Sequence, residues 1–80
     1  MNSTRNEALL QALGSHLKKI RESREMSLRK LADKADVDFS QIHRIEKGES
    51  NPSFTMLLAL AGALEVEPAF LFSFERPDAR

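Results

Sequence analysis

Apolar residues recur at helical spacing along most of the chain, and no segment alternates with the two-residue period of a strand. The first helical stretch runs from about Glu7 to Arg24, and its apolar residues are Leu9, Leu10, Leu13, Leu17 and Ile20. Residues 1–6 are polar and expected to be flexible, and the pair Thr4 and Glu7 is typical of a capping box. Gly14 costs this helix about 1 kcal/mol relative to alanine, which close packing against another helix would explain.

Two short helices are predicted next. Ser27 is a good N-cap for the first of them, whose apolar face consists of Leu28, Leu31, Ala32 and Ala35. Asp36 interrupts the pattern and can take the left-handed conformation at a helix end. Asp38 and Gln41 have the spacing of a capping box at the start of the second helix, which covers residues 38–47.

Two further helices complete the expected domain, residues 7–74. Gly48 ends the preceding helix, and Ser53 caps a fourth helix with the apolar stripe Phe54, Leu57, Leu58, Ala61 and Leu64. Pro68 suits the first turn of a short fifth helix, and residues 75–80 form an expected flexible tail.

The two short helices, joined by about three residues, have the spacing of a helix-turn-helix. Ala32 is small enough to lie where two steeply crossing helices touch, and apolar residues beneath the second helix are Val37, Ile42 and Ile45. The polar residues left to face solvent are Ser40, Gln41, His43, Arg44 and Lys47. Because such a helix fits the major groove and can reach base edges, the pattern predicts DNA binding.

The net charge is zero, but its distribution is uneven. Residues 16–47 hold nine basic and six acidic residues, a net charge of +3, and the rest of the chain has −3. This weak separation of charge fits a modest basic surface near the helix-turn-helix and an acidic C-terminal third.

Several classes of protein are not expected. The chain has no cysteine and only two histidines, so neither a disulfide framework nor a metal site is expected. No signal peptide is expected, and the longest apolar run, residues 56–64, is too short to span a bilayer, so a cytoplasmic protein is expected. It also has no phosphate-binding loop, HExxH motif or evident catalytic triad. Enzymatic activity, a cofactor and a small-molecule ligand are therefore not expected.

The stretch from Leu13 to Phe72, about three quarters of the chain, resembles the phage-repressor and Cro-like (Xre-type) family without gaps. The matching residues are Leu17, Ile20, Arg21, Ser27, Leu31, Ala32, Ala35, Val37, Ile42, Arg44, Ile45, Glu46, Lys47, Gly48, Asn51, Pro52, Ser53, Leu57, Ala61, Ala63, Leu64, Val66 and Leu71. The resemblance implies an all-α, five-helix, lambda-repressor-like domain that binds double-stranded DNA. It further implies a homodimer on a two-fold operator.

The resemblance also implies residue roles. Phe39, Ser40 and Arg44 would face base edges. The residues expected near the DNA backbone or groove walls are Gln41, His43, Lys47 and Asn51, with Ser27 at the start of the motif. Arg21 would pair with Glu46 and tie the first helix to the third as structure.

Three positions depart from the family pattern. Leu28 stands where a glutamine usually touches phosphate, and Glu25 and Asp36 replace usual glycines. Phe39 is unusual at a base-facing position. It could pack against a thymine methyl group or fold back onto Leu28 as local core.

Three aromatic residues near the C-terminus, Phe70, Phe72 and Phe74, are more than one small core is expected to hide. The fourth helix is apolar nearly all round, which implies a covered second face. We expect a dimer interface that combines these aromatics with Ala59 and Ala63 on the outer face of that helix.

Two functions are compatible with the sequence. Arg44, Lys47 and the intact turn favour a sequence-specific transcriptional regulator. Zero net charge and Leu28 favour a protein-interaction module or antitoxin-like partner that keeps the fold without gripping DNA. Short members of the family include restriction–modification controllers, prophage repressors and antitoxins, and the sequence favours none of them.

Overall fold

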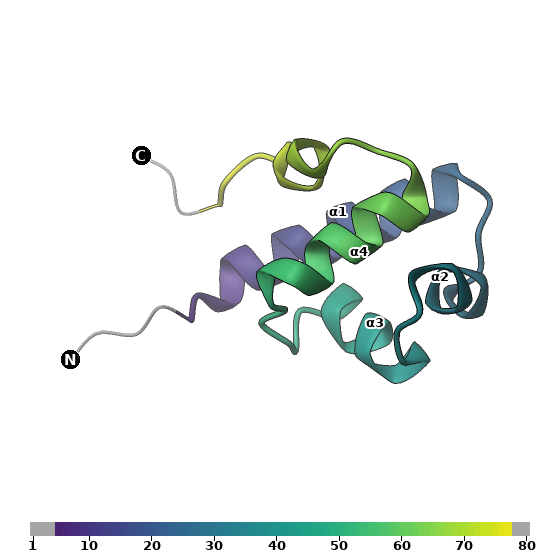
Figure 1. The fold of residues 1–80 in the computed structure, drawn as a ribbon. Coiled ribbons are helices and arrows are strands. Elements are labelled where there is room, and N and C mark those ends of the chain that lie inside the picture. Colours follow the sequence, from purple (N-terminus) through teal and green to yellow (C-terminus); the bar gives the residue numbers. More distant parts are fainter. Residues whose placement is uncertain (1–4, 78–80) are drawn as a thin grey trace.

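The computed structural model describes residues 5–77, and these form four α-helices and one short 3-10 helix (Figure 1). The elements are α1 (Glu7–Ser23), α2 (Leu28–Ala35), α3 (Phe39–Glu46), α4 (Phe54–Leu64) and η1 (Pro68–Phe72). The all-helical expectation is confirmed, but a fifth α-helix is wrong. The backbone N–H of Phe70 bonds to the Glu67 carbonyl, and that of Ser73 to the Phe70 carbonyl, the three-residue spacing of a 3-10 helix.

At the starts of two helices, the observed cap differs from the expected one. α1 begins after Asn6, whose side chain accepts a hydrogen bond from the Leu9 backbone N–H at 3.0 Å. Thr4, the expected cap, lies outside the described residues, as do most of residues 1–6 and part of residues 75–80. The capping box at α3 is wrong. Asp38 makes no side-chain cap bond, and the Gln41 N–H bonds instead to the Asp38 backbone carbonyl.

Other helix boundaries follow the expected chemistry. Ser27 caps α2 and Ser53 caps α4, each by accepting a hydrogen bond from a backbone N–H three residues ahead. Asp36 ends α2 in the left-handed conformation at φ 57°, as expected. Glu25 and Glu65 also have positive φ, at 57° and 60°. Glu25 and Asp36 are the two residues that replace the family's glycines.

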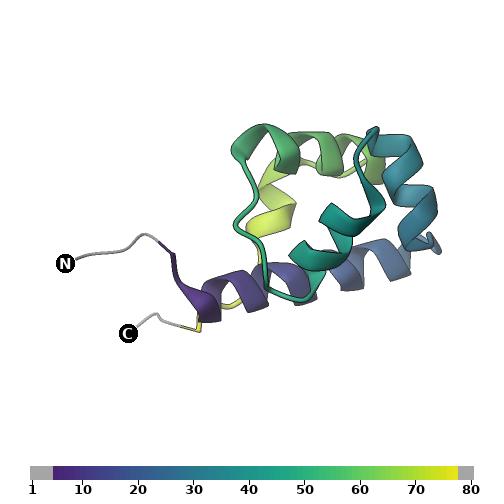
Figure 2. The ribbon, with the colours of Figure 1, turned by 90° about the horizontal axis from the view of Figure 1, so that it is seen from below.

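The core lies between α1, α4 and the two helices of the helix-turn-helix (Figures 1 and 2). Its large side chains, each below 2 % exposure, are Leu17, Leu31, Ile42, Ile45, Leu60, Leu64 and Leu71. The expected stripe on α4 is partly wrong, because Phe54 is 69 % and Leu58 39 % exposed while Leu60 is fully buried. Both α2 and η1 pack on α4, and the side of α4 that carries Leu60 is therefore buried.

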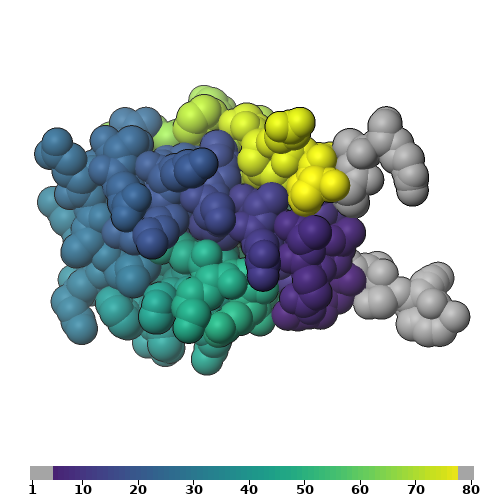
Figure 3. Space-filling model, turned by 180° about the vertical axis from the view of Figure 1, so that it is seen from behind, coloured from purple at the N-terminus to yellow at the C-terminus, as the bar shows by residue number. Residues whose placement is uncertain are grey.

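α1 occupies the centre of the face seen in Figure 3, with α3 along one side of it and the C-terminal segment along the other. The helix-turn-helix and the C-terminal aromatics thus lie on different sides of α1. No helix in residues 5–77 is long and apolar enough to cross a membrane.

Candidate nucleic-acid interface

α3 has one buried and one exposed side. Ile42 and Ile45 are 0 % and 2 % exposed and anchor the helix to the core. The exposed residues of α3 and its C-cap are Phe39, Ser40, Gln41, His43, Arg44 and Lys47. The expectation that the polar side chains of this helix face solvent is confirmed.

The turn between α2 and α3 is held by the backbone and by small or apolar residues. The Val37 N–H bonds to the Ala32 carbonyl at 3.0 Å, and the left-handed Asp36 reverses the chain between them. Ala32 is 4 % exposed, and Val37 is half-buried against the core. These contacts hold α3 in place from below, so that its outer side is presented on a rigid support.

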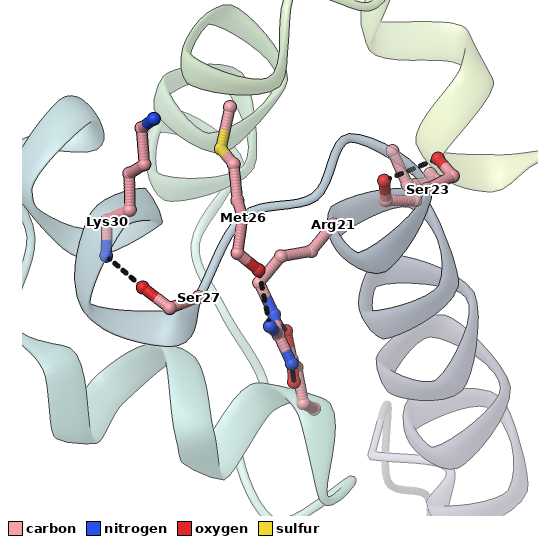
Figure 4. A network of polar contacts seen from close by, with 7 residues as sticks. Arg21, Ser23, Met26, Ser27 and Lys30 are labelled. Atoms are coloured by element: carbon pink, nitrogen blue, oxygen red, sulfur yellow. Dashed lines mark hydrogen bonds and ion pairs between the residues drawn. The ribbon is translucent and has the colours of Figure 1, made fainter.

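A buried ion pair ties α1 to α3. Arg21 Nε donates to Glu46 Oε2 at 2.7 Å, and Arg21 Nη2 donates to Glu46 Oε1 at 3.0 Å. The two side chains are only 9 % and 4 % exposed, so the predicted structural pair is present and has the bidentate geometry of strong Arg–carboxylate pairs. Arg21 Nη1 also donates to the Met26 carbonyl at 2.8 Å, a bond the sequence did not suggest (Figure 4).

The environment of Arg21 favours its charged form. The hydrogen bonds from its guanidinium to Glu46 raise the pKa of Arg21, and burial, which acts in the opposite direction, does not cancel this. Arg21 therefore stays cationic and joins three segments: the end of α1, the turn before α2 and the end of α3.

Gly14 lets the backbones of α1 and α3 approach closely. A Cβ atom at this position would lie against the Ile45 carbonyl oxygen and 2.7 Å from the Glu46 carbonyl oxygen. These are backbone atoms, which cannot rotate away as a side chain can. The expected close packing at Gly14 is confirmed, and the helix that it meets is α3.

Phe39 has neighbours that the sequence did not suggest. The guanidinium carbon of Arg29 lies 5.1 Å from the centroid of its ring, within the range of a cation–π contact. The ring centroid of His43, four residues further along α3, lies 6.3 Å away. Arg29 is thereby brought from α2 to the start of α3. A positive charge ten residues before an aromatic gives no pattern by which this contact could have been found.

Three of the expected DNA contacts lie outside α3 in the sequence. Ser27 is exposed, and its Oγ accepts a hydrogen bond from the Lys30 N–H at 3.0 Å. Asn51 is exposed in the loop before α4. Lys47 Nζ lies 3.4 Å from a carboxylate oxygen of Glu49, an exposed pair that the sequence analysis missed.

The C-terminal aromatics divide into two kinds. Phe70 and Phe72 are 47 % and 51 % exposed, whereas Phe74 is half-buried against the core. On α4, Ala59 is exposed but Ala63 is 6 % exposed and belongs to the core. The placing of Ala63 on the outer face of α4 was wrong, because the packing of neighbouring elements turns that side inward.

An apolar groove of about 300 Å³ lies between α1 and the C-terminal segment. Its lining residues are Leu9, Leu10, Leu13, Phe72, Phe74 and Arg76. His16 fastens the segment to α1, since its Nε2 lies 2.9 Å from the Phe70 carbonyl oxygen. Among residues 5–77, no three potential metal ligands of the His, Asp or Glu type come together.

The family model described as helix-turn-helix matches residues 17–71 of this chain. The chain belongs to the helix-turn-helix family. Its phage-repressor and Cro-like character is supported by a relative, the immunity repressor protein of Bacillus phage phi105, with 38 % identity over 55 residues. That match covers 69 % of this chain but only 38 % of the phage repressor, so the chain spans well under half of that protein.

Solved structures of this helix-turn-helix type share the fold. The restriction–modification controller protein C.AhdI from Aeromonas hydrophila is 35 % identical with a TM-score of 0.78, over 79 % of this chain and 96 % of that one. The clp gene regulator ClgR from C. glutamicum is 28 % identical with a TM-score of 0.75, over 80 % and 83 %. The controller protein C.Esp1396I, as a tetramer in complex with its natural 35-base-pair operator, is 30 % identical with a TM-score of 0.75, over 89 % and 88 %.

Proposed function

We propose that this helix-turn-helix protein is a sequence-specific DNA-binding transcriptional regulator that reads the major groove with α3. The observation that carries the proposal is the two-sided α3, whose polar side is exposed while Ile42 and Ile45 fix its other side to the core. Regulators and an immunity repressor among its relatives support the same reading. A regulator of this bacterial and phage type works in the cytoplasm, where its DNA lies.

Base reading is assigned to Phe39 and Ser40 at the start of α3 and to Arg44 in its last turn. Arg44 can donate two hydrogen bonds to one guanine, the commonest specific contact in the major groove. Ser40 can donate to or accept from base edges, and Phe39 offers an apolar surface. Gln41 and His43 lie on the same exposed helix and are assigned to the groove walls.

Backbone contacts are assigned to residues at the edges of the motif. Lys47 and Asn51 are exposed at and beyond the end of α3. Ser27 uses its oxygen to accept the cap bond, which leaves its O–H free to donate to a phosphate oxygen. Such contacts hold the protein in register on the duplex without reading sequence.

We further propose that the protein acts as a homodimer on a two-fold operator. Two recognition helices must face successive major grooves, about 34–36 Å apart, so the interface has to lie away from α3. Phe70 and Phe72 meet this requirement, since the C-terminal segment and α3 flank α1 on opposite sides (Figure 3). Phe74, which lines the apolar groove, and Ala59, which is exposed on α4, are assigned to the same interface.

The first experiment measures binding to random genomic fragments at low and moderate salt. A DNA-binding regulator enriches particular fragments, and its affinity falls steeply as salt rises because counterions are released from the duplex. A protein that retains no fragment at either salt concentration is instead the protein-interaction module or antitoxin-like partner, and the proposal of DNA binding is then wrong.

The interface is tested with two phenylalanine substitutions and sedimentation at micromolar concentration. Phe70→Glu should give a folded monomer that binds a palindromic site far more weakly, because a buried interface aromatic contributes about 2 kcal/mol or more. Phe54→Glu changes another exposed phenylalanine, on α4, and should leave the dimer intact. A monomeric wild type would overturn the homodimer, and a dimer lost with Phe54 rather than Phe70 would show that the interface lies elsewhere.

A further inference from the structure

Arg29 and His43 both lie near the Phe39 ring at the start of the recognition helix, and the three residues are here called the Phe39 stack. Arg29 covers the Phe39 ring with its guanidinium at 5.1 Å, and the His43 ring lies 6.3 Å from it with a tilt of 47°. Both distances fall within the ranges at which cation–π and aromatic pairs attract. The stack therefore holds the Phe39 ring in a defined place on the outer surface.

The position of the stack matters for DNA reading. Phe39 is the first residue of α3, and the N-terminal side chains of a recognition helix are those that reach base edges. The ring is 38 % exposed and lies outside the core, whereas Leu28 packs against the core. Phe39 is therefore open to solvent over part of its surface. It presents an apolar surface where the rest of α3 presents polar groups.

Arg29 adds a positive charge and N–H donors beside the Phe39 ring. Within the described part of the chain, no hydrogen bond or ion pair joins the Arg29 side chain to another residue. The contact with Phe39 is not a hydrogen bond, so the five N–H donors of the Arg29 guanidinium remain available. The contact with Phe39 therefore holds a cation with free donors beside an exposed apolar ring.

We propose that the Phe39 stack recognises the 5-methyl group of a pyrimidine in the major groove while Arg29 donates to a neighbouring phosphate. This inference rests on the proposed function and deepens it. The 5-methyl of thymine is the apolar group that the major-groove edges of the four bases present, and phenylalanine is a side chain that contacts it. The methyl group of 5-methylcytosine occupies the same place and offers the same chemistry.

The test begins with a site selected by the wild-type protein from a random DNA library. At each pyrimidine of that site, four duplexes are compared, carrying thymine, uracil, 5-methylcytosine or cytosine. Removal of the methyl group should weaken wild-type binding about fourfold at one position per half-site, the equivalent of exposing one methyl group. The effect should be similar in the thymine–uracil and the methylcytosine–cytosine pairs, which separates the methyl group from the identity of the base.

Variants then assign the effect to the stack. Phe39→Ala should bind the methylated and the unmethylated duplex of each pair alike at that position, with only a small change in melting temperature because Phe39 is exposed. Phe39→Leu keeps an apolar side chain but no ring. It should therefore keep part of the methyl preference but lose the phosphate contact of Arg29, which the ring holds in place.

Arg29 is examined by the salt dependence of binding. Arg29→Ala should reduce the slope of log affinity against log salt by about one per protomer, as loss of a phosphate contact does. In the Phe39→Ala background the same change should have a smaller effect, because Arg29 is no longer held in place. Lys19→Ala removes a cation from the exposed side of α1 and should leave both the slope and the methyl preference unchanged.

The outcomes separate this inference from the proposed function. A wild-type protein that selects no DNA overturns both. A selected site without a methyl-sensitive position, or a Phe39→Ala variant that keeps the full methyl preference, overturns the role of the Phe39 stack and leaves DNA binding intact. An Arg29→Ala variant with the wild-type salt slope overturns the phosphate contact.

Discussion

The side of α3 that faces α1 and the side that faces solvent differ in how closely their residues are held. On the inner side, Ile42 and Ile45 are buried, the Glu46 carboxylate makes two hydrogen bonds to Arg21, and the backbone meets Gly14 without space for a Cβ atom. On the outer side, exposed polar residues have few partners, and the ion pair of Lys47 with Glu49 is open to solvent.

This difference shows how a helix of eight residues can combine a fixed position with a variable surface. Buried contacts on the inner side determine where α3 lies, and they contain no information about DNA sequence. Exposed residues on the outer side can change without a large effect on folding, because surface substitutions usually alter stability by less than about 0.5 kcal/mol. Substitutions on the two sides should therefore alter different measurements.

The largest expected effect is a loss of stability in Glu46→Ala. This change leaves the buried Arg21 cation without its carboxylate, and breaking a buried pair costs about 3–5 kcal/mol. Chemical denaturation measures the effect. The matched control is Glu49→Ala, which removes an exposed carboxylate three residues away and should change the unfolding free energy very little. Equal unfolding midpoints for both variants would mean that the pair with Arg21 does not stabilise the fold.

Gly14→Ala should also destabilise the protein, by about 1–3 kcal/mol, because the added methyl group would separate α1 from α3. Gly62 offers a control within another helix, since nothing lies within 4 Å of a Cβ atom built there. Gly62→Ala should stabilise the protein by up to about 1 kcal/mol through helix propensity. Thermal melts of the two variants should thus shift in opposite directions, and a shift in the same direction would contradict the close approach at Gly14.

Much of the fold could be predicted from the sequence, because helical periodicity located α1, α2 and α3, although the expected caps of α1 and α3 were corrected. The left-handed Asp36 followed from residue type, and the Arg21–Glu46 pair followed from the family resemblance. In α4 the prediction was less accurate. That helix is apolar on nearly every side, so periodicity alone could not show that Ala63 is buried and Phe54 exposed.

The parts that could not be predicted depend on tertiary placement. Asp38 could have capped α3 by its residue type, yet its side chain makes no cap bond. The contact of Arg29 with Phe39 joins two helices whose relative position sequence spacing does not give. The element at Pro68 was expected to be an α-helix, but its hydrogen bonds have 3-10 spacing and it extends over five residues only.

Arg44→Ala tests the solvent-facing side of α3. The variant should keep the stability of the wild type and lose specificity for its DNA site. A bidentate contact to guanine is worth about 1–3 kcal/mol of discrimination against the wrong base. Binding to single-base variants of the selected site should show preference lost at one position per half-site, while the melting temperature stays that of the wild type. If the variant selects the same site with unchanged affinity, Arg44 does not read a base.

Lys47→Ala should have the smallest effect and a different pattern. A phosphate contact carries no base information, so affinity should fall about equally on all sequences, and the salt slope should shrink by about one per protomer. Glu49 sharpens this prediction, because its carboxylate lies 3.4 Å from Lys47 Nζ and competes with phosphate for that cation. Glu49→Gln should therefore raise affinity slightly on every sequence, and it should do nothing once Lys47 is alanine. A change confined to one base pair in Lys47→Ala would assign Lys47 to base reading and extend the reading surface of α3 to its C-cap.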